Sequence, residues 1–335
     1  MTILVTGAAG FIGYHVCQAL LAQKKSVFGI DNLNDYYDVN LKKARLAQLK
    51  KQTQFTFQLI DIVARKPMIQ LFSKQTFTTV IHLAAQASVR YSLKDPHSYI
   101  DNNVVGFMNV LEGCRVQQVD HLIYASTSSV YGANKQQPSH ESSSCNHPLA
   151  IYAATKKANE LMAHSYANLY QLPCTGLRFF TVYGPWGRPD MALFKFTKNI
   201  LNGKPIDVYN HGNMTRDFTY IDDIANGILS LIDKPAQPDP NWDHNTQDSA
   251  CSYAPYSIYN IGNGHPVSLL DYIHAIEQAL GKSARYHMMP LQSGDALTTH
   301  ADTTRLQKAV DYQPYTNIQT GIARFVTWYR QYYKI

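Results

Sequence analysis

A tyrosine and a lysine four residues apart, Tyr152 and Lys156, are the pair in this sequence best suited to acid–base chemistry. Segment 151–170 has a helical pattern, and positions i and i+4 of a helix lie on one face. A free phenol has a pKa of about 10 and is a poor base at neutral pH. An ammonium at about 5 Å, with an effective dielectric constant near 20, would stabilise the phenolate by roughly 3 kcal/mol, or about two pKa units. The pair predicts a tyrosine base tuned by a lysine, although ordinary amphipathic helices share this spacing.

Four hydroxyl side chains, Ser126-Thr127-Ser128-Ser129, follow the apolar segment 122–125. At the carboxyl end of a strand, such hydroxyls can hydrogen-bond a reacting alcohol and relay its proton to Tyr152. Thr127 and Ser128 are therefore catalytic candidates beside Tyr152 and Lys156. A serine-rich turn without a catalytic role is the alternative that composition leaves open.

The glycine pattern of Gly7, Gly10 and Gly13 lies between an apolar segment, 2–5, and a helical one, 12–22. In a dinucleotide site the first glycine permits a tight turn, the second lets the backbone approach a pyrophosphate, and the third lets helix and strand pack closely. The helix N-terminus then offers free N–H groups to the phosphates. Three glycines alone also fit a plain strand–turn–helix.

Asp31 ends the second apolar segment, eighteen residues after Gly13. A carboxylate there can accept hydrogen bonds from an adenosine ribose and would repel a 2′-phosphate, which favours NAD over NADP. Asp31, followed by Asn32, could instead cap a turn or helix. The order of strand, glycines, helix, strand and acid favours the nucleotide site.

The elements that would position these residues alternate between strands and helices. This β-α-β alternation predicts an α/β fold, a Rossmann-type doubly wound parallel sheet that binds ligands at the carboxyl ends of its strands. The predicted strands are residues 2–5, 26–30, 55–59, 79–82, 122–125 and 173–178, and the predicted helices are 12–22, 41–50, 99–117 and 151–170.

After residue 180 the pattern changes to turn-rich segments and shorter helices, predicted at 192–201, 222–232, 269–280 and 318–329. We expect residues 1–180 to form the nucleotide-binding domain. Residues 181–335 would form a smaller C-terminal substrate-binding lobe, with some segments returning to the first domain. The polar, proline-containing stretch 235–256 is predicted to be an exposed loop.

Composition indicates a globular protein of a reducing compartment. The formal charge is +6 with scattered Lys and Arg, which does not predict a nucleic-acid surface but suits an anionic substrate. The five cysteines form no CxxC pair, and no residue pattern predicts a metal site. The sequence opens directly into a strand without a signal-peptide pattern, and no eighteen apolar residues run together. We therefore expect a cytoplasmic protein with no membrane partner.

Seven motifs together resemble the extended short-chain dehydrogenase/reductase superfamily and, more closely, the NAD-dependent UDP-glucuronate 4-epimerases. The resemblance covers residues 1–333, apart from about 236–256. The glycine and Tyr/Lys motifs are general to the superfamily, whereas DNLNDYYD and TVYGPWGRPDMALF are more specific. The motifs are TGAAGFIG, DNLNDYYD, HLAAQASVRYS, YASTSSVYG, YAATKKANELMA, GLRFFTVYGPWGRPDMALF and RDFTYIDDI.

The resemblance implies a set of site residues. Those expected at the NAD site are Gly7, Gly10, Phe11, Ile12, Gly13, Asp31, Asn32, Asp61, Ile62, Leu83, Asn102, Tyr152 and Lys156. Those expected to meet the sugar nucleotide are Arg90, Thr127, Ser128, Ser129, Thr181, Arg188, Arg216 and Asp295. In this family pattern Lys156 also holds the nicotinamide ribose, Thr127 bonds the C4 oxygen, Arg216 lies near phosphate and Asp295 near uridine.

The activity implied is C4 epimerisation of UDP-glucuronic acid to UDP-galacturonic acid, an isomerase reaction that would serve polysaccharide synthesis. Tyr152 would remove the C4 hydroxyl proton while NAD+ takes the hydride, and both would return to the other face of a 4-keto sugar. That intermediate is a β-keto acid prone to lose CO2, so its carboxylate must be held. The planar fork of Arg188 suits a carboxylate, although a loop arginine in solvent is the alternative.

Other functions stay open at this stage. Ser88 stands where the family pattern has glycine, and Thr215 replaces a basic residue before Arg216; both leave the sugar preference open. A UDP-glucuronate decarboxylase or a 4-epimerase of another UDP-hexose shares the first oxidation. A 4,6-dehydratase fits less well because Thr127 is followed by serines and not by Asp-Glu. A non-enzymatic NAD-sensing scaffold is the alternative from another class. The resemblance also suggests a homodimer joined through helices 99–117 and 151–170.

Overall fold

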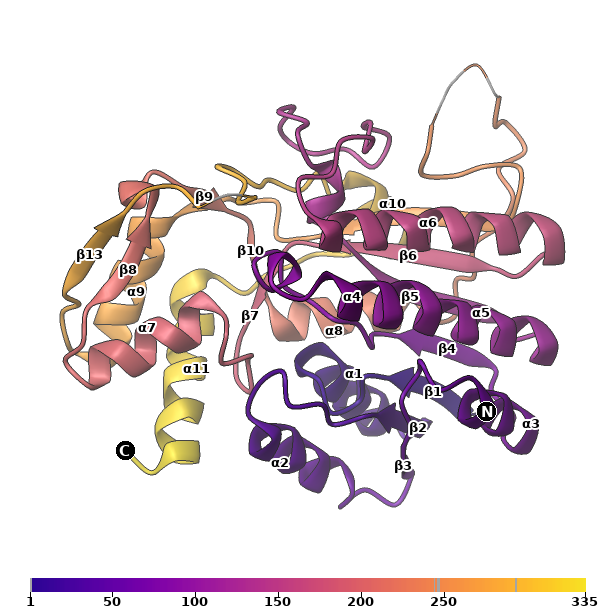
Figure 1. Cartoon of the computed structure of the whole chain (residues 1–335), viewed down its shortest axis with the longest axis horizontal. Coiled ribbons are helices and arrows are strands. Elements are labelled where there is room, and N and C mark those ends of the chain that lie inside the picture. Colours follow the sequence, from indigo (N-terminus) through magenta and orange to yellow (C-terminus); the bar gives the residue numbers. More distant parts are fainter. Residues whose placement is uncertain (1, 244, 246–247, 293) are drawn as a thin grey trace.

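The computed structural model describes residues 2–243, 245, 248–292 and 294–335. At its centre is a seven-stranded, wholly parallel sheet in the order β3-β2-β1-β4-β5-β6-β11 (Figure 1). Most strands are apolar along their length because helices cover both faces of the sheet. The predicted doubly wound α/β fold is thus confirmed. The strands are β1 (Thr2–Thr6), β2 (Ser26–Asp31), β3 (Phe55–Leu59), β4 (Thr79–His82), β5 (His121–Thr127), β6 (Cys174–Phe179) and β11 (Tyr256–Ile261).

Two helical layers bury the faces of this sheet. One face packs in a common apolar cluster with α1 (Phe11–Ala22), α2 (Val39–Leu49) and α8 (Ile221–Leu231). The other packs with α3 (Arg65–Lys74), α5 (Gly106–Gln117) and α6 (Ile151–Tyr170). The strand order reverses between β1 and β4, so the carboxyl ends of these neighbours border the crevice where such sheets bind ligands.

A smaller lobe lies beside the sheet, at the left of Figure 1. Helices α7 (Ala192–Leu201), α9 (Leu269–Leu280) and α11 (Ile318–Tyr333) share a third apolar cluster, and β8 (Ile206–Tyr209) pairs in parallel with β13 (Tyr286–Met289). Two short ladders join β7 (Thr181–Tyr183) to β10 (Phe218–Tyr220) and β9 (Thr215–Arg216) to β12 (Val267–Ser268).

The chain after residue 180 contributes to both parts of the molecule. Helix α8 and strand β11 complete the first sheet and its covering layer, and α10 (Thr304–Val310) adds Leu306 to the same apolar cluster. Segments from after residue 180 therefore return to the first domain, so the two domains are not separated at a single point in the sequence. In the described part of the chain, no helix has both the length and the apolarity that a membrane span requires.

Two helical segments in the first 180 residues differ from the sequence prediction. The helix expected over 99–117 is divided into α4 (Pro96–Tyr99), a π-helical turn (Ile100–Val105) and α5. This turn contains Asn103, whose buried amide holds the backbone N–H and C=O of Gln86 beside the cleft. Helix α3 was not predicted, although Met68, Leu71 and Phe72 mark its buried face at helical spacing.

Candidate active site

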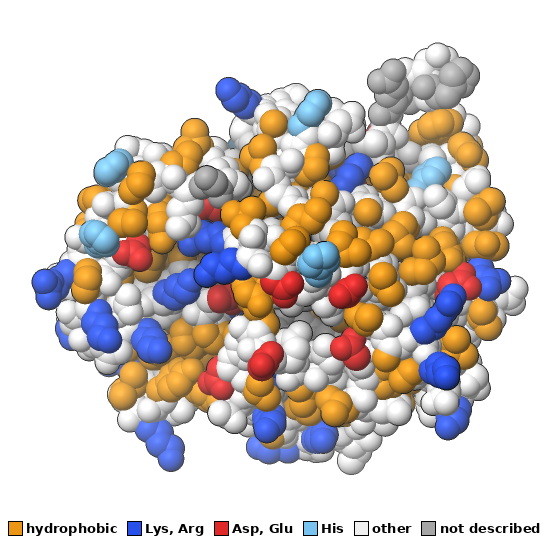
Figure 2. Space-filling view, in the orientation of Figure 1, with side chains coloured by type: hydrophobic (Ala, Val, Ile, Leu, Met, Phe, Trp, Pro, Cys, Tyr) orange, Lys and Arg blue, Asp and Glu red, His pale blue; other side chains and the backbone are white. Residues whose placement is uncertain are grey.

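A cleft of about 1520 Å³ lies between the two parts of the molecule. Its walls come from the glycine loop after β1, the segments after β4 and β5, the start of α6 and the smaller lobe. In Figure 2 a hollow opens near the middle of the face; Asp and Glu side chains border it, and Lys and Arg side chains gather on the side of the smaller lobe. The group of cations on that side suits an anionic ligand.

The glycine loop packs tightly against the neighbouring backbone because its glycines lack side chains. Gly7 has φ +71°, and a Cβ there would lie 2.8 Å from the backbone nitrogen of Ala84. A Cβ on Gly13 would collide with the carbonyl oxygen of Gly7, so only glycine lets α1 begin this close to β1. The N-terminus of α1 consequently opens onto the cleft.

Asp31 fills the turn-capping role weighed from the sequence, and its ribose-binding role stays a prediction. Its Oδ2 accepts a hydrogen bond from Ala9 N at 3.1 Å, and its Oδ1 accepts one from Leu33 N at 2.8 Å. It therefore caps a turn and at the same time fixes the glycine loop while lining the cleft. Burial raises the pKa of the Asp31 carboxyl, and these hydrogen bonds and the Lys42 charge act against the rise.

The next part of the predicted nucleotide site is built around Asn32 and Asp61. Asn32 Nδ2 donates to Asp61 Oδ2 at 3.0 Å, and Val63 N donates to Asp61 Oδ1 at 2.9 Å. Asn32 and Ile62 line the cleft, whereas Asp61, which was predicted to do so, does not. Asn102 lines the cleft while donating to Ser98 O at 2.8 Å.

Tyr152 and Lys156 lie in the first turns of α6 and both reach the cleft. Burial raises the pKa of Tyr152, while a hydrogen bond with the Thr127 hydroxyl and the Arg188 charge lower it. Lys156 is 1% exposed, and among the described residues its Nζ has no hydrogen-bond partner. Burial lowers its pKa to about 7, and Glu160 acts against this fall. The charge that lowers the Tyr152 pKa is that of Arg188, so the expected activation of Tyr152 by Lys156 stays a prediction.

The hydroxyl run divides between the cleft and the interior. Ser129 N donates to Thr127 Oγ1 at 3.2 Å, and Thr127 Oγ1 donates to Ser129 Oγ at 3.3 Å. Thr127 is the last residue of β5 and Ser129 lies in the turn that follows, and with Ser128 they line the cleft. Ser126 also borders the cleft but donates inward to Glu160 Oε1 at 2.6 Å. The run is therefore a structured wall on the cleft.

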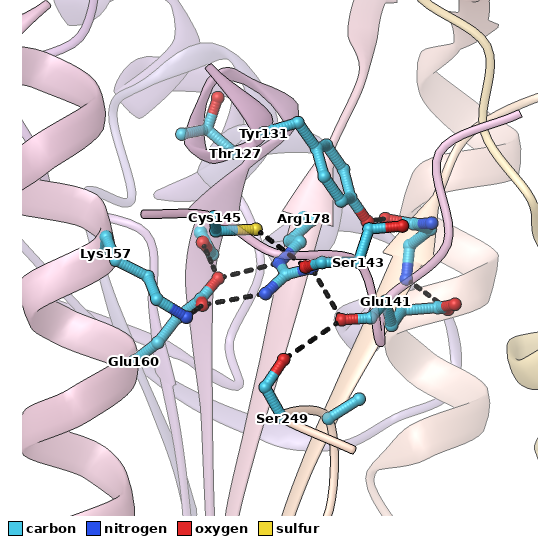
Figure 3. A network of polar contacts seen from close by, with 12 residues as sticks. Thr127, Tyr131, Glu141, Ser143, Cys145, Lys157, Glu160, Arg178 and Ser249 are labelled. Atoms are coloured by element: carbon cyan, nitrogen blue, oxygen red, sulfur yellow. Dashed lines mark hydrogen bonds and ion pairs between the residues drawn. The ribbon is translucent and has the colours of Figure 1, made fainter. Parts of the chain in front are cut away.

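A buried ion-pair network lies behind Thr127 (Figure 3). Arg178 on β6 donates from Nε and Nη2 to the two carboxylate oxygens of Glu160, each at 2.9 Å, and both side chains are almost fully buried. Lys157 adds a contact to Glu160 at 2.9 Å. Arg178 Nη1 donates to Glu141 O at 3.0 Å. The network, with the Ser126–Glu160 hydrogen bond, ties together β5, β6 and α6, the last of which carries Tyr152 and Lys156.

Arg188 lies on the cleft but is already paired. Its Nε donates to Asp190 Oδ1 at 3.0 Å and its Nη2 to Asp190 Oδ2 at 2.5 Å, with a further bond from Nη2 to Ala87 O at 3.2 Å. Tyr36 donates to the same carboxylate at 3.1 Å, and its ring faces the guanidinium. The arginine is thus neither a solvent side chain nor a free cation.

At the other end of the cleft, Arg90 donates to Asp295 Oδ2 at 2.8 Å and stacks over the Tyr209 ring. This ion pair joins the first lobe to the smaller one. Arg216 donates to Leu297 O at 2.9 Å, and burial lowers its pKa. Thr181 borders the cleft at the start of β7. These groups form a cationic end suited to a diphosphate.

The two departures from the family pattern differ in position. Ser88 lines the cleft with φ +131°, a backbone conformation that favours glycine. Its hydroxyl accepts from Tyr91 N at 3.3 Å, and its carbonyl accepts from Tyr99 Oη at 2.6 Å. Thr215 instead lies in the β9–β12 ladder and bonds Leu297 through its backbone.

The structure brings nearly all the predicted site residues to one cleft. Those on its wall are Gly7, Gly10, Phe11, Ile12, Gly13, Asp31, Asn32, Ile62, Leu83, Arg90, Asn102, Thr127, Ser128, Ser129, Tyr152, Lys156, Thr181, Arg188, Arg216 and Asp295. Sequence reasoning missed Tyr36, Asp190 and Gln292, which also line it. Tyr36 lies within the quoted DNLNDYYD motif and Asp190 two residues after Arg188, so proximity to these motifs was the available signal.

A dinucleotide cradle, a Tyr/Lys pair on the helix that follows β5, and a second lobe over the cleft define an extended short-chain dehydrogenase/reductase. Residues 3–262 match the model of the NAD dependent epimerase/dehydratase family. The chain belongs to this family, which confirms the resemblance seen in its motifs.

Within this family, the chain is similar over nearly its whole length to proteins named as UDP-glucuronate 4-epimerases. The chain is 45% identical, over 100% of its length and 98% of the relative's, to the probable UDP-glucuronate 4-epimerase of Rhizobium meliloti (strain 1021). It is 35% identical, with a TM-score of 0.88, to UDP-glucuronic acid 4-epimerase from Bacillus cereus in complex with UDP-glucuronic acid and NAD; 99% of this chain and 100% of that one are covered. A Tyr-to-Phe variant of that enzyme, in complex with UDP-4-deoxy-4-fluoro-glucuronic acid and NAD, is 34% identical over 99% of this chain and 100% of that one, with a TM-score of 0.86.

Proposed function

We propose that this chain is an NAD-dependent epimerase that converts UDP-glucuronic acid to UDP-galacturonic acid through a 4-keto intermediate. The observation that carries the proposal is the convergence of Thr127, Tyr152 and Lys156 on the same cleft as the glycine loop and Arg188. The relatives named for this activity support it over nearly the whole chain.

The residues present fit NAD as the resident cofactor. The close packing that Gly7 and Gly13 allow brings the N-terminus of α1 to the cleft wall, which suits a pyrophosphate, and Asp31 lies at the end of β2, where an adenosine ribose is bound in such folds. The buried amine of Lys156, which has no hydrogen-bond partner among the described residues, matches a ribose hydroxyl. Bound NAD+ would supply the oxidation of C4 and its reversal, so no net redox change occurs.

Tyr152 is the proposed general base and acid at the C4 oxygen. The Thr127 hydroxyl lowers the pKa of Tyr152 and both side chains line the cleft, so a C4 hydroxyl placed between them could pass its proton to the phenolate and receive it back. Burial raises the pKa of Tyr152, and the positive nicotinamide ring would act in the opposite direction together with Arg188. The Tyr-to-Phe variant studied in the Bacillus cereus enzyme is consistent with a tyrosine at the centre of the reaction.

Arg188 is the proposed partner of the sugar carboxylate. The 4-keto sugar loses CO2 when the bond to its carboxylate stands perpendicular to the carbonyl group, so an epimerase must hold the carboxylate out of that orientation. Arg188 is fixed by Asp190 and Ala87, and the Thr127–Ser129 wall lines the same cleft. Arg90, Arg216 and Asp295 would meet the nucleotide at the other end.

The test is to incubate the purified protein with UDP-glucuronic acid, without added cofactor, and to follow products by NMR. UDP-galacturonic acid supports the proposal. A UDP-4-keto-pentose with CO2 would identify a decarboxylase, turnover of UDP-glucose alone would identify a neutral-sugar epimerase, and bound NAD without turnover would identify a sensing scaffold. Each of these three results rejects the proposal.

We also propose that the enzyme is a cytoplasmic homodimer. The five cysteines are buried free thiols, which suits a reducing compartment. Exposed apolar side chains follow one face of two adjoining helices, which Tyr166 on α6 connects through its hydrogen bond to Glu112 on α5. They are Val105, Met108 and Val116 before and on α5, and Leu161 and Leu169 on α6.

The oligomeric state of a Met108→Glu/Leu161→Glu variant tests this interface. Light scattering after size exclusion should show a dimer for the parent and a monomer for this variant. Leu59→Glu, an equally exposed position on the edge strand β3, is the control and should stay dimeric. A parent monomer would reject the dimer.

A further inference from the structure

Arg45, on α2, is fully buried and uses its whole guanidinium group. Nε donates to Trp186 O at 3.1 Å, and Nη2 donates to Trp186 O at 2.6 Å and to Gly187 O at 3.3 Å. Nη1 donates to Ala9 O at 2.9 Å and to the Tyr37 hydroxyl at 2.7 Å. Its side chain is 0% exposed, and it does not line the cleft.

These acceptors come from two parts of the active site that are far apart in sequence. Ala9 lies in the glycine loop of the nucleotide cradle, and Trp186 and Gly187 immediately precede Arg188. Arg45 therefore spans the distance between the cofactor loop and the loop that carries the proposed carboxylate ligand. Tyr37, its fourth partner, follows Tyr36, which contacts Asp190.

The loop before Arg188 is held on the nucleotide-binding part at other points as well. His15 on α1 contacts Pro185 O through Nε2 at 2.9 Å, and the Tyr14 ring lies 5.4 Å from the Trp186 ring. Trp186 adopts φ +61°, which is unfavourable for a bulky residue. A loop in this conformation requires external contacts, and Arg45 provides most of the hydrogen bonds to its carbonyl groups.

Burying a cation whose hydrogen bonds go to uncharged oxygens is expensive, and the nearby Asp31 carboxylate offsets only part of that cost, so Arg45 is a poor choice for stability alone. In the described part of the chain, every hydrogen bond that Arg45 donates goes to a carbonyl or hydroxyl oxygen. Only the planar fork of arginine offers five donors that reach both loops at once; a lysine reaches one at a time.

We propose that Arg45 is a positioning residue that registers the Arg188 loop against the cofactor's glycine loop. Its role is to fix the distance between the carboxylate grip and the site of oxidation at C4, and so to limit decarboxylation. This inference rests on the proposed function, because the role assigned to Arg188 comes from it.

A mutant cycle tests whether Arg45 acts through Arg188. We expect Arg45→Met to lower kcat/KM for UDP-glucuronic acid by about 10–100-fold and to increase 4-keto-pentose release, because a displacement of about 1 Å can cost that much. In an Arg188→Ala background the same change should cost less than about twofold, since interacting residues are not additive. Lys43→Met, an exposed position on the same helix, is the control and should behave as the parent.

Equal losses in both backgrounds, or parent-like kinetics of Arg45→Met, would overturn the proposal. Arg45→Lys covers the case in which the methionine variant does not fold. The lysine variant should fold but should release more 4-keto-pentose relative to UDP-galacturonic acid than the parent does. Parent-like behaviour of this variant again overturns the proposal. If neither variant folds, the role is structural and the proposal fails.

A readout that needs no turnover separates this proposal from the proposed function. With 5-fluorotryptophan incorporated, the ¹⁹F resonance of Trp186, assigned by Trp186→Phe, should shift in Arg45→Lys and Arg45→Met but not in Lys43→Met. The Trp242 resonance serves as the internal reference. If the parent does not convert UDP-glucuronic acid, the proposed function fails while this shift still decides whether Arg45 positions the loop; an unchanged resonance overturns it.

Discussion

Asp190 binds Arg188 in a bidentate pair, with Nε–Oδ1 at 3.0 Å and Nη2–Oδ2 at 2.5 Å. The pair is almost electrically neutral, so a substrate carboxylate does not meet an isolated cation. Asp190 sets the orientation of the guanidinium, and among the described residues Nη1 donates to none, which leaves it for a ligand. Recognition of a hexuronate at this arginine is therefore a matter of geometry more than of net charge.

Arg188→Ala should raise KM for UDP-glucuronic acid by about 10–100-fold, because a charge-assisted hydrogen bond contributes roughly 1.5–3 kcal/mol. It should also release detectable 4-keto-pentose. Steady-state kinetics with product analysis by NMR measures both effects. Arg324→Ala, half-exposed on α11, is the matched control. Unchanged binding and product would remove Arg188 from the site.

Ser88→Gly should make the protein more stable and less effective on its substrate. Glycine relieves φ +131°, which costs on the order of 1 kcal/mol for a residue with a side chain. Burial raises the pKa of Tyr36, and the Ser88 hydroxyl opposes this rise. Because Tyr36 donates to Asp190, the partner of Arg188, we expect the loss of this hydroxyl to loosen the Tyr36–Asp190–Arg188 group. We expect KM for UDP-glucuronic acid to increase several-fold.

Urea unfolding and kinetics on the same preparations check that prediction. Lys24→Gly, at φ +59° on a turn outside the cleft, should gain stability without a change in KM. A Ser88→Gly enzyme with parent kinetics would show that the strain has no catalytic purpose.

Tyr152→Phe should lower kcat by about 10²–10⁴-fold, the usual contribution of general acid–base catalysis, while KM changes little. The NAD content, measured by absorbance after denaturation, should remain that of the parent because Lys156 and the glycine loop are intact. Tyr170→Phe, exposed at the end of the same helix, should be fully active. A Tyr152→Phe enzyme as fast as the parent would end the proposed mechanism.

Much of the fold could be predicted because buried parallel strands and amphipathic helices leave periodic apolar patterns. Helix Ile151–Tyr170 and the first six strands lie within a few residues of their predicted places. Strand β11 was missed because Tyr256–Ile261 follows a polar loop in the half expected to form the second lobe, and only the folded sheet shows that it pairs with β6. Long-range pairing of this kind leaves little local signal.

The site was predictable where a motif carries its own geometry, as with Gly7 or the Tyr152–Lys156 spacing. The pKa shifts of the site residues could not be predicted in this way. Lys156 was expected to lower the pKa of Tyr152, but depth of burial, a tertiary property, governs both groups. In the same way, nothing in the sequence distinguishes Arg45 from other residues of its helix. The two loops that it joins, at Ala9 and Trp186, come together only in the fold.

The Glu160–Arg178 pair should make the protein acid-sensitive in a defined window. Burial alone would raise the pKa of Glu160, but the Arg178 charge and hydrogen bonds outweigh it and lower the value from 4.5 to about 2. A depressed carboxyl pKa stabilises the folded state fully above pH 4.5, and this contribution is lost as pH falls through 2. Glu160→Gln leaves Arg178 buried without its counter-ion and should cost about 3–5 kcal/mol at pH 7. The difference in unfolding free energy between this variant and the parent should shrink between pH 4.5 and 2, as followed by urea unfolding at each pH.

Glu112→Gln, which breaks the more exposed pair with Arg115, is the control and should cost about 1 kcal/mol or less. If both variants lose the same stability, the buried network does not anchor the strand that ends at Thr127.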